Sequence, residues 1–396
     1  MWRRKTERRN ALRGGLSPAR PGPQALSSRR GLIRRPQTPR PGALLCENHL
    51  VTDLVRGERR GDRDAQAQGP SGPVTVSIVM PTYNYGRFLP EALESLRAQT
   101  LRDWECIVVD DGSTDDTIAV LGTAAANDSR VRYVSQANLG PSAARNRGVA
   151  ESVGNYIQFL DADDVLPPTK LEVQVLAMES DPSIGIVYSD GRYFLDSPTE
   201  LLSYRVPGPR PSTPPDKSSV DPLLRALVDH NIMAVEGPLI RKSALATIGS
   251  FDEGLVRVED WQLWLRCALA GVRFVADSAE ERAVRVRAHR DSSTRNEIAM
   301  LSSELVVRRW LDPQLDEPNL RRQNRSQSQK TLVRMCVLEG KDGRLTVGVR
   351  NLLTAGVAER RLDWLLLACV LPLLRLPGSN RILALRRRLL RRSRMW

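Results

Sequence analysis

The chain has 396 residues, of which 41% are hydrophobic and 27% charged, an ordinary composition for a folded protein of this size. Its net charge of +13 is carried by the two ends. Residues 1–73 hold 16 Lys/Arg against 6 Asp/Glu and residues 375–396 hold 8 Arg and no acid, so the other 301 residues carry −5. That mildly acidic central part argues against a nucleic-acid-binding protein.

The first 73 residues are rich in Arg, Pro, Gly and Ser and contain only scattered apolar residues. Such a segment buries too little surface to offset its ordering entropy, so it is predicted to be a disordered basic extension without an assigned function. It also lacks the apolar core of a secretory signal. The five cysteines show no paired spacing, which favours reduced thiols in a cytoplasmic protein and argues against structural zinc.

From residue 74 to about residue 190, short apolar runs alternate with amphipathic segments. Strands are predicted over 76–81, 105–110, 131–135, 155–160 and 184–189. Helices are predicted over 86–99, 114–126, 141–153 and 168–180. This alternation is typical of an α/β protein with a mostly parallel sheet flanked by helices, and we expect residues 74–190 to form the first half of a domain.

The next block, 191–295, is expected to form the second half of the same domain. Residues 196–219 are rich in Pro and Ser and are predicted to be a surface loop. Helices over 221–230 and 259–270 and strands over 272–276 and 282–288 are expected to follow. A helical extension over 296–360 contains the predicted helices 294–311 and 327–358.

Residues 361–396 combine an apolar stretch with an Arg-rich end. The stretch is shorter than the roughly 20 apolar residues that span a bilayer, and Pro372 interrupts it. We therefore expect either an amphipathic segment lying on an anionic membrane, which would make the protein peripheral at the inner face of the membrane, or a terminal helix that closes the core.

Two acidic segments, about fifty residues apart, each follow an apolar run: Asp110–Ser113 and Asp161–Asp164. Ligands of open α/β sheets bind beyond the carboxyl ends of the strands. Carboxylates gathered there repel each other unless a cation or hydrogen-bond donors lie between them. A divalent metal that holds a diphosphate meets this need, so the pattern predicts an enzyme that handles an activated nucleotide.

Over residues 74–295, the order of the motifs resembles that of family-2 glycosyltransferases, which have the Rossmann-like GT-A fold. The resemblance implies that residues 74–190 form a nucleotide-sugar-binding half and residues 191–295 an acceptor-binding half. The resemblance begins at Val76–Asn84, where it implies that Pro81 and Tyr83 contact the nucleobase. It continues with Asp110 and Asp111, whose carboxylates accept hydrogen bonds from the base or the ribose. Helix capping is a compatible second role for this segment.

The segment Asn138–Gly148 offers small residues and a helix N-terminus that suits a polyanion. By resemblance, Arg145 and Asn146 line the donor site; an arginine on an exposed helix face is the competing interpretation.

The segment Asp161–Asp164 matches the DxD element of the family. Its oxygen ligands suit Mn²⁺ or Mg²⁺. Asp163 is the first choice for a direct ligand, Asp161 is expected to reach the ribose or a metal-bound water, and Asp164 is a substitute for either. A calcium loop is excluded because the Gly and Glu of an EF-hand are missing and two prolines follow.

The segment Val258–Arg266 resembles the ED motif of the family, which precedes a Trp-rich helix. This implies that Asp260 is the catalytic base and that Glu259 supports it or binds the acceptor. A helix first turn attracts acids for dipole reasons alone, which is the competing interpretation. After a predicted strand, His289 is expected as a further metal ligand and Arg290 as a cation for the diphosphate; a purely structural histidine is the alternative.

The resemblance implies an inverting, metal-dependent glycosyltransferase that moves a sugar from a UDP- or dTDP-sugar to a hydroxyl acceptor, either a glycan or a lipid-linked glycan. Cell-surface polysaccharide or glycolipid assembly is the expected setting. The alternative is a membrane-docked scaffold that binds a nucleotide-sugar or glycan without turnover.

Overall fold

The five apolar runs of the first half form strands whose ends differ from the predicted ones by at most one residue. They are β1 (Val76–Thr82), β2 (Trp104–Asp110), β3 (Val131–Ser135), β4 (Tyr156–Phe159) and β5 (Ile184–Ser189). Every residue of β2, β4 and β5 is buried, as expected for strands covered on both faces. The computed structural model describes residues 74–206, 221–289, 296–341, 349–350 and 353. The predictions for residues 1–73, Arg290 and the tail 361–396 lie outside these ranges.

These strands belong to a seven-stranded sheet with the order β3-β2-β1-β4-β8-β5-β9. Two strands of this sheet come from the second half of the domain. They are β8 (Pro238–Arg241), which lies between β4 and β5, and β9 (Arg273–Asp277), which lies at the edge. All neighbouring pairs are parallel except those of β8, which runs antiparallel to both β4 and β5. The two predicted halves therefore share one sheet, and the mostly parallel α/β fold predicted from the sequence is confirmed.

A second sheet has the order β10-β6-β7 and is built from β6 (Gly191–Phe194), β7 (Leu201–Val206) and β10 (Val284–Arg287). The prediction of a surface loop over 196–219 was wrong for its first part, because β7 pairs antiparallel with β6. The rest of that segment lies outside the described residues. β10 also bridges to Val165, just after β4.

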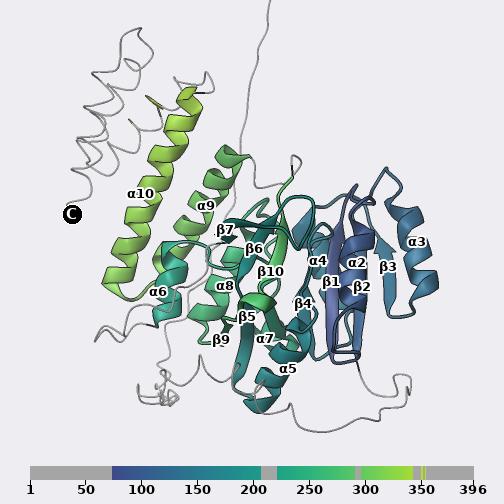
Figure 1. Cartoon of the computed structure of the whole chain (residues 1–396). Helices are drawn as coiled ribbons and strands as arrows, with labels where there is room; N and C mark the ends of the chain where they lie inside the picture. The colour runs from purple at the N-terminus through teal and green to yellow at the C-terminus, as the bar shows by residue number, and fades with distance from the viewer. Residues whose placement is uncertain (1–73, 207–220, 290–295, 342–348, 351–352, 354–396) are drawn as a thin grey trace, which may run out of the picture. The chain divides into compact units, whose positions relative to one another are not determined.

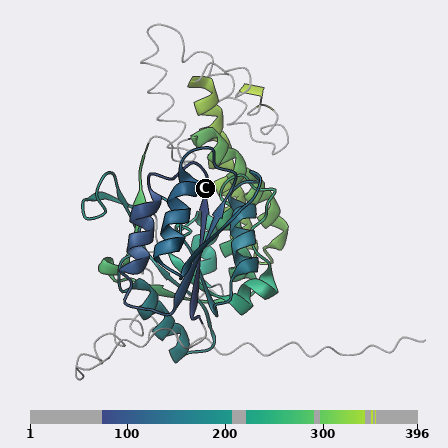
Figure 2. The same cartoon turned by 90° about the vertical axis from the view of Figure 1, so that its right-hand side faces the viewer.

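Helices cover both faces of the large sheet (Figures 1 and 2). On one face α2 (Leu89–Arg97), α3 (Thr117–Asn127) and α5 (Lys170–Ser180) enclose a core with alternate strand residues such as Met80. On the other face lie α4 (Pro141–Glu151), α7 (Lys242–Ile248) and α8 (Glu259–Leu269), where Val79 and Trp264 are buried. Helix α7 was not predicted from the sequence.

Three further helices join the second core: α6 (Pro222–Asp229), α9 (Glu297–Leu311) and α10 (Pro318–Lys341). Short 3₁₀ helices lie at Glu280–Arg282 and Asp312–Gln314. The predicted helix 327–358 begins earlier, at Pro318, and its end falls partly outside the described residues. Leu311 and Leu320 are buried in the same core as Trp261 of α8, so α9 and α10 pack on the second half of the domain. None of the described helices combines the length and apolarity that crossing a bilayer requires.

Candidate active site

The acidic segments of the sequence lie at one edge of the large sheet, because β1, β2 and β4 run parallel and end side by side. Asp110 is the last residue of β2, and Asp161 follows β4 by two residues. The side chain of Asp110 is buried and accepts a hydrogen bond from the Ser113 backbone N–H at 3.1 Å. Parallel pairing thus brings together residues that are about fifty positions apart.

Asp111 is buried, and both of its oxygens accept hydrogen bonds from the chain itself. Oδ1 accepts from Gln136 Nε2 at 2.8 Å and from the Leu139 N–H at 2.9 Å, and Oδ2 accepts from the Gly140 N–H at 2.8 Å. Since Gly140 precedes α4, Asp111 ties the end of β2 to the start of that helix. Among the bonds described, the Asp110 carboxylate by contrast accepts only from the Ser113 N–H.

The end of β1 carries Pro81 and the loop after it carries Tyr83, the residues expected at the nucleobase. Pro81 is half-buried, whereas Tyr83 is 44% exposed, so its ring is accessible at this edge. The next residue, Asn84, has φ = 57° and accepts from the Thr114 N–H at 2.7 Å. Asparagine tolerates this left-handed conformation well, and here its side chain holds the loop after β2 against the loop after β1.

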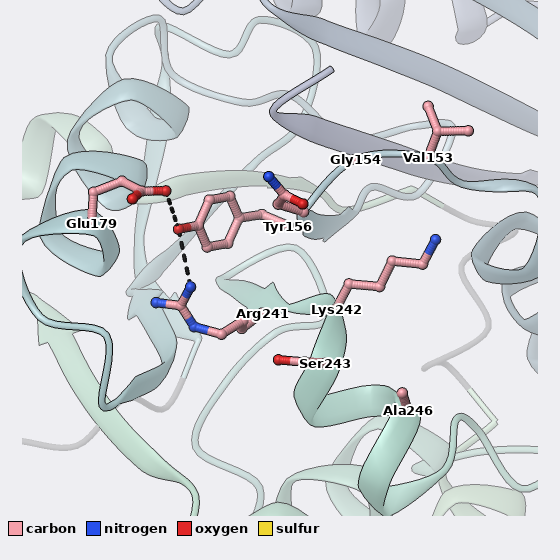
Figure 3. Close-up of a pocket in the computed structure, with 9 residues that line it drawn as sticks. Val153, Gly154, Tyr156, Glu179, Arg241, Lys242, Ser243 and Ala246 are labelled. Atoms are coloured by element: carbon pink, nitrogen blue, oxygen red, sulfur yellow. Dashed lines mark hydrogen bonds between the residues drawn. The ribbon is translucent and has the colours of Figure 1, made fainter. Parts of the chain in front are cut away.

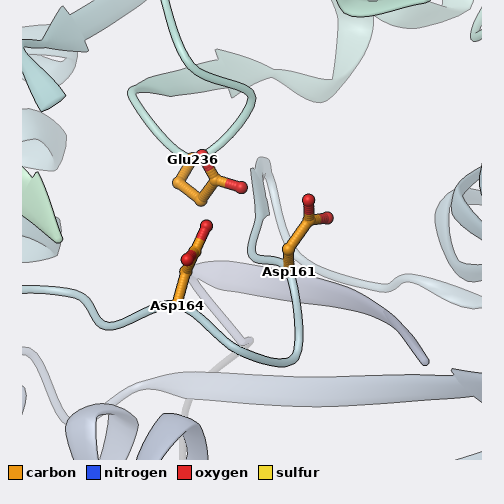
Figure 4. A group of neighbouring side chains, drawn as sticks. All are labelled: Asp161, Asp164 and Glu236. Carbon is orange, nitrogen blue, oxygen red and sulfur yellow. The ribbon is translucent and has the colours of Figure 1, made fainter. Parts of the chain in front are cut away.

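Three carboxylates converge beyond the end of β4: those of Asp161, Asp164 and Glu236 (Figure 4). One oxygen from each lies within 4.8 Å of the others. Burial and the nearby carboxylates raise the pKa of Asp164 well above its usual value, and burial together with Asp161 raises that of Glu236 to about 8. These are the marks of carboxylates without enough positive charge around them.

Glu236 was not among the residues predicted from the sequence. It lies two residues before β8, whose antiparallel pairing places Leu239 opposite Gln158 and therefore brings Glu236 to the end of β4. An acid before a Gly-Pro turn carries no recognisable pattern of its own. The direction of β8 is the information that was missing.

The remaining members of the predicted metal set, Asp163 and His289, contact each other. His289 Nε2 lies 2.8 Å from Asp163 Oδ2, and both side chains are largely buried. The His289 ring packs against Tyr85 and Phe88, with ring centroids 5.7 and 5.0 Å away. Asp163 and His289 thus form a pair next to the cluster of Asp161, Asp164 and Glu236.

Arg287, on β10, fixes the loop that carries these acids and was not predicted as a site residue. Its backbone N–H donates to Asp164 Oδ1 at 2.7 Å, and its Nε donates to the Asp163 carbonyl at 3.0 Å. The guanidinium also contacts Glu91 of α2 and lies over the Phe194 ring at 4.4 Å. The acidic loop is therefore held from the second sheet.

Arg145 joins the two halves of the domain. Its buried guanidinium donates to Asp161 Oδ1 and to Glu259 Oε1, each at 2.7 Å. Burial opposes the charge of Arg145, but the two carboxylates outweigh this and raise its pKa. The interpretation of Arg145 as an exposed surface residue is excluded by its 4% exposure. Glu259 is thereby held as the partner of a cation.

Asn146 does not face the acidic cluster. Its amide donates to the Phe251 carbonyl at 3.0 Å and to Glu253 at 2.8 Å, and its carbonyl oxygen accepts from the Phe251 N–H at 2.9 Å. It thus fastens α4 to the turn before α8. Phe251 in turn lies beneath the guanidinium of Arg145, 5.3 Å from ring centroid to Cζ.

Asp260 is the partly exposed member of the acidic pair at the start of α8. Its Oδ2 accepts from Asn231 Nδ2 at 2.9 Å and its Oδ1 from the Trp261 N–H at 2.7 Å. Burial and the neighbouring Glu259 raise the pKa of Asp260 to about 7. The preceding residue, Val258, has φ = 55°, a strained conformation for a β-branched residue.

A cavity of about 620 Å³ lies at the other end of the sheet, near the start of β4 (Figure 3). The Tyr156 hydroxyl there contacts Glu179 and accepts from Arg241 at 3.3 Å. Lys242 donates to the Ser152 carbonyl. The cavity is separate from the acidic site, and these polar groups are engaged by the protein itself.

The chain is similar in sequence to two bacterial proteins. Over 104 residues the chain is 44% identical to an uncharacterized glycosyltransferase of Rickettsia felis, which covers 26% of this chain and 17% of that protein. Over 196 residues it is 32% identical to the chondroitin synthase of Escherichia coli, covering 50% of this chain and 27% of that protein. The chain thus spans well under half the length of both relatives.

A solved structure shares the fold. The mannosyltransferase PcManGT from Pyrobaculum calidifontis, in complex with GDP-Man and Mn²⁺, superposes with a TM-score of 0.50 at 17% identity, over 87% of this chain and 92% of that one. Residues 77–236 match the family described as Glycosyl transferase family 2. This stretch includes β1, β2, β4 and the loop of acids from Asp161 to Asp164, and it ends at Glu236. The chain therefore contains a domain of glycosyl transferase family 2 with the GT-A fold.

Proposed function

We propose that this protein transfers a sugar from a nucleotide-diphosphate sugar to a hydroxyl acceptor, with inversion at the anomeric carbon. The observation that carries the proposal is the convergence of Asp161, Asp164 and Glu236 beyond the end of β4, in the stretch that matches family 2. Arg145 links this cluster to the start of α8 through Asp161 and Glu259.

The carboxylates fit a divalent cation. Oxygens of Asp161, Asp164 and Glu236 lie close enough to share one ion, and the raised pKa values of Asp164 and Glu236 reflect charge that such an ion would neutralise. Asp163 and His289 are adjacent and complete the proposed set for Mn²⁺ or Mg²⁺. When bound, the cation supplies positive charge to the diphosphate leaving group.

Asp260 is proposed as the base. An inverting transfer needs a carboxylate that accepts the proton of the acceptor hydroxyl as that oxygen attacks the sugar. Asp260 is partly exposed, and its pKa of about 7 suits a base at neutral pH. Glu259 is proposed to support it by holding Arg145 in place. The hydrogen bond from Asn231 Nδ2 is proposed to orient the Asp260 carboxylate.

Pro81, Tyr83 and Asp110 are proposed to bind the nucleotide, with Tyr83 offering an accessible ring and Asp110 a carboxylate at the strand end. The donor is proposed to be a UDP- or dTDP-sugar. Asp111 and Asn146 are proposed to support this site indirectly, because Asp111 holds the start of α4 at Gly140 and Asn146 holds its middle against the turn at Phe251. The acceptor is proposed to be a glycan or a lipid-linked glycan at the cytoplasmic face of a membrane.

The test is turnover of UDP- and dTDP-sugars with Mn²⁺ by the native chain and by Asp260→Asn. We expect at least a hundredfold loss of turnover in the variant, with nucleotide binding unchanged, because only proton acceptance is removed. Asp252→Asn is the matched control, since Asp252 lies on the surface near α8 and its carboxylate accepts only from the Gly254 N–H among the bonds described.

Equal turnover by the native chain and Asp260→Asn would refute Asp260 as the base. Nucleotide-sugar binding without turnover by the native chain would instead favour a scaffold that binds its ligand and leaves it intact.

A further inference from the structure

A fully buried lysine lies behind the acidic cluster. Lys170 is the first residue of α5 and is 0% exposed. Its Nζ donates to Gln158 Oε1 at 2.5 Å and to Gln174 Oε1 at 2.8 Å. Lysine is seldom fully buried, because the loss of hydration disfavours its charge, and here burial lowers its pKa to about 7.

The first of these partners leads directly to the cluster. Gln158, also 0% exposed, lies on β4, and its Nε2 donates to the Glu236 carbonyl at 2.8 Å and to the Phe159 carbonyl at 2.6 Å. Gln174 has no such continuation, since its Nε2 is buried without a partner. Lys170 therefore reaches one of the three converging carboxylate residues through a single side-chain amide.

The hydrogen-bonding groups of Lys170 and Gln158 fix the orientation of the Gln158 amide. An amide side chain presents an acceptor at one end and donors at the other, and either orientation fits the same space. The lysine amine facing it serves as the donor in both contacts described. Its position therefore selects the orientation in which Gln158 turns its oxygen to Lys170 and its NH₂ group to the Glu236 carbonyl. The reverse orientation would set two oxygens against each other.

We propose that Lys170 is a positioning residue for the cation site: through Gln158 it holds Glu236 where its carboxylate meets those of Asp161 and Asp164. The inference rests on the proposed function, because it concerns the cation assigned to that site. Residues behind a metal site that orient its ligands typically contribute about 10–100-fold to metal affinity.

The experiment measures Mn²⁺ binding to the purified full-length chain by titration calorimetry and by the EPR signal of free Mn²⁺, without any activity assay. Lys170→Met keeps the length of the side chain and removes the donor. We expect the Kd for Mn²⁺ to rise about tenfold. Gln158→Met should raise it by a similar factor. The double variant should be no worse than either single one, because the two side chains act in series.

The sign of the change separates positioning from simple charge. If Lys170 acted only as a nearby cation, its removal would lessen repulsion and tighten Mn²⁺ binding, and Gln158→Met would have little effect. Gln174→Met is the matched control. It removes the other acceptor of Lys170 but keeps the hydrogen bonds that run from Lys170 through Gln158 to Glu236, so its Kd for Mn²⁺ should stay within about twofold of the native value. Circular dichroism and thermal melts check folding, and Gln158→Met carries the test if Lys170→Met does not fold.

Two failures can be told apart. Native chain that binds no Mn²⁺ would overturn the metal assignment of the proposed function and this inference with it. Native chain that binds Mn²⁺ while Lys170→Met and Gln158→Met bind it equally well would overturn the inference alone.

Discussion

Asp260 and Glu259 are adjacent in the chain but have different surroundings. Glu259 faces the buried guanidinium of Arg145, whereas Asp260 has a neutral amide, that of Asn231, and the Trp261 N–H as its partners. A partly desolvated carboxylate beside another acid holds a proton more readily, and the pKa of Asp260 is raised accordingly. Glu259 is thus engaged in the ion pair with Arg145, whereas Asp260 is a titrating group.

This difference predicts a pH dependence. The pKa of Asp260 is raised to about 7, and a base must be unprotonated, so kcat/KM should fall as the pH drops below about 7, by roughly tenfold per pH unit well below that value. Asn231→Ala removes a donor that favours the charged form, so it should move this acidic limb to higher pH. Rate measurements from pH 5 to 9 check both. A limb that does not move in Asn231→Ala would contradict the role of Asn231.

At individual positions, sequence reasoning proposed the acids of the segment 161–164 but missed Glu236 and the arginine that holds their loop. Asp161, Asp163 and Asp164 follow an apolar run, which is a recognisable pattern, whereas Arg287 and Glu236 become site residues only through pairing of distant strands. The expectation that Asn146 faces the donor had no means of detecting its bonds to the turn at Phe251. Such contacts depend on how helices approach one another, which local sequence does not encode.

Helix α4 lies so close to β1 that one position has no room for a side chain. A Cβ built on Gly148 would lie 2.3 Å from Val79 Cγ1, a short and buried side chain. Gly148→Ala should therefore lower the free energy of unfolding by about 1–3 kcal/mol. Urea denaturation measures the loss.

Gly122 provides the control for this substitution. It lies within α3, and a Cβ there would meet nothing within 4 Å. Because alanine is the better helix former, Gly122→Ala should be neutral or raise the stability by up to about 1 kcal/mol. Equal effects at the two glycines would show that the contact between α4 and β1 is looser than described.

Helix α9 is fastened to α6 by one arginine. Arg308 is 2% exposed and donates to the Val228 and Asp229 carbonyls, at 3.0 and 2.8 Å, where α6 ends. Arg308→Leu would leave these helix-terminal carbonyls and Glu304 without this donor, and we expect it to lower the free energy of unfolding by about 3 kcal/mol. Arg325→Leu, which affects the exposed pair with Asp312, should change it by less than about 1 kcal/mol. Denaturant midpoints distinguish the two variants. Equal losses of stability would contradict the role of Arg308 in holding α9 against α6.

The strands of the first half were predictable from sequence because each contains a short apolar run. The runs 106–109 in β2 and 186–188 in β5 are continuous and apolar, and the strand bounds match closely. β7 lies beside a Pro/Ser-rich segment and belongs to a small sheet, so the sequence predicts it as part of a loop. The direction of β8 was likewise hidden, because four residues between a turn and α7 read the same for parallel and antiparallel pairing.

At the scale of the whole protein, the proposed cation site at Asp161, Asp164 and Glu236 predicts that Mn²⁺ stabilises the fold. We expect Mn²⁺ in excess of its Kd to raise the melting temperature by several degrees, since a ligand that binds only the folded state shifts the equilibrium by mass action. EDTA should reverse the shift, and Glu236→Gln should reduce it. A thermal-shift series with Mn²⁺ and with nucleotide-sugars checks this. An identical shift in Glu236→Gln would exclude Glu236 from the cation site.

The position of Glu236 depends on the register of β8. Leu239 packs into one core and Ile240 into the other, while Glu236 lies two residues before the strand begins. Sliding this strand by a single position would exchange the faces of both apolar residues and withdraw the acid at the same time. A molecule that has misaligned this strand cannot be well packed, so every properly packed copy also has its third carboxylate in place.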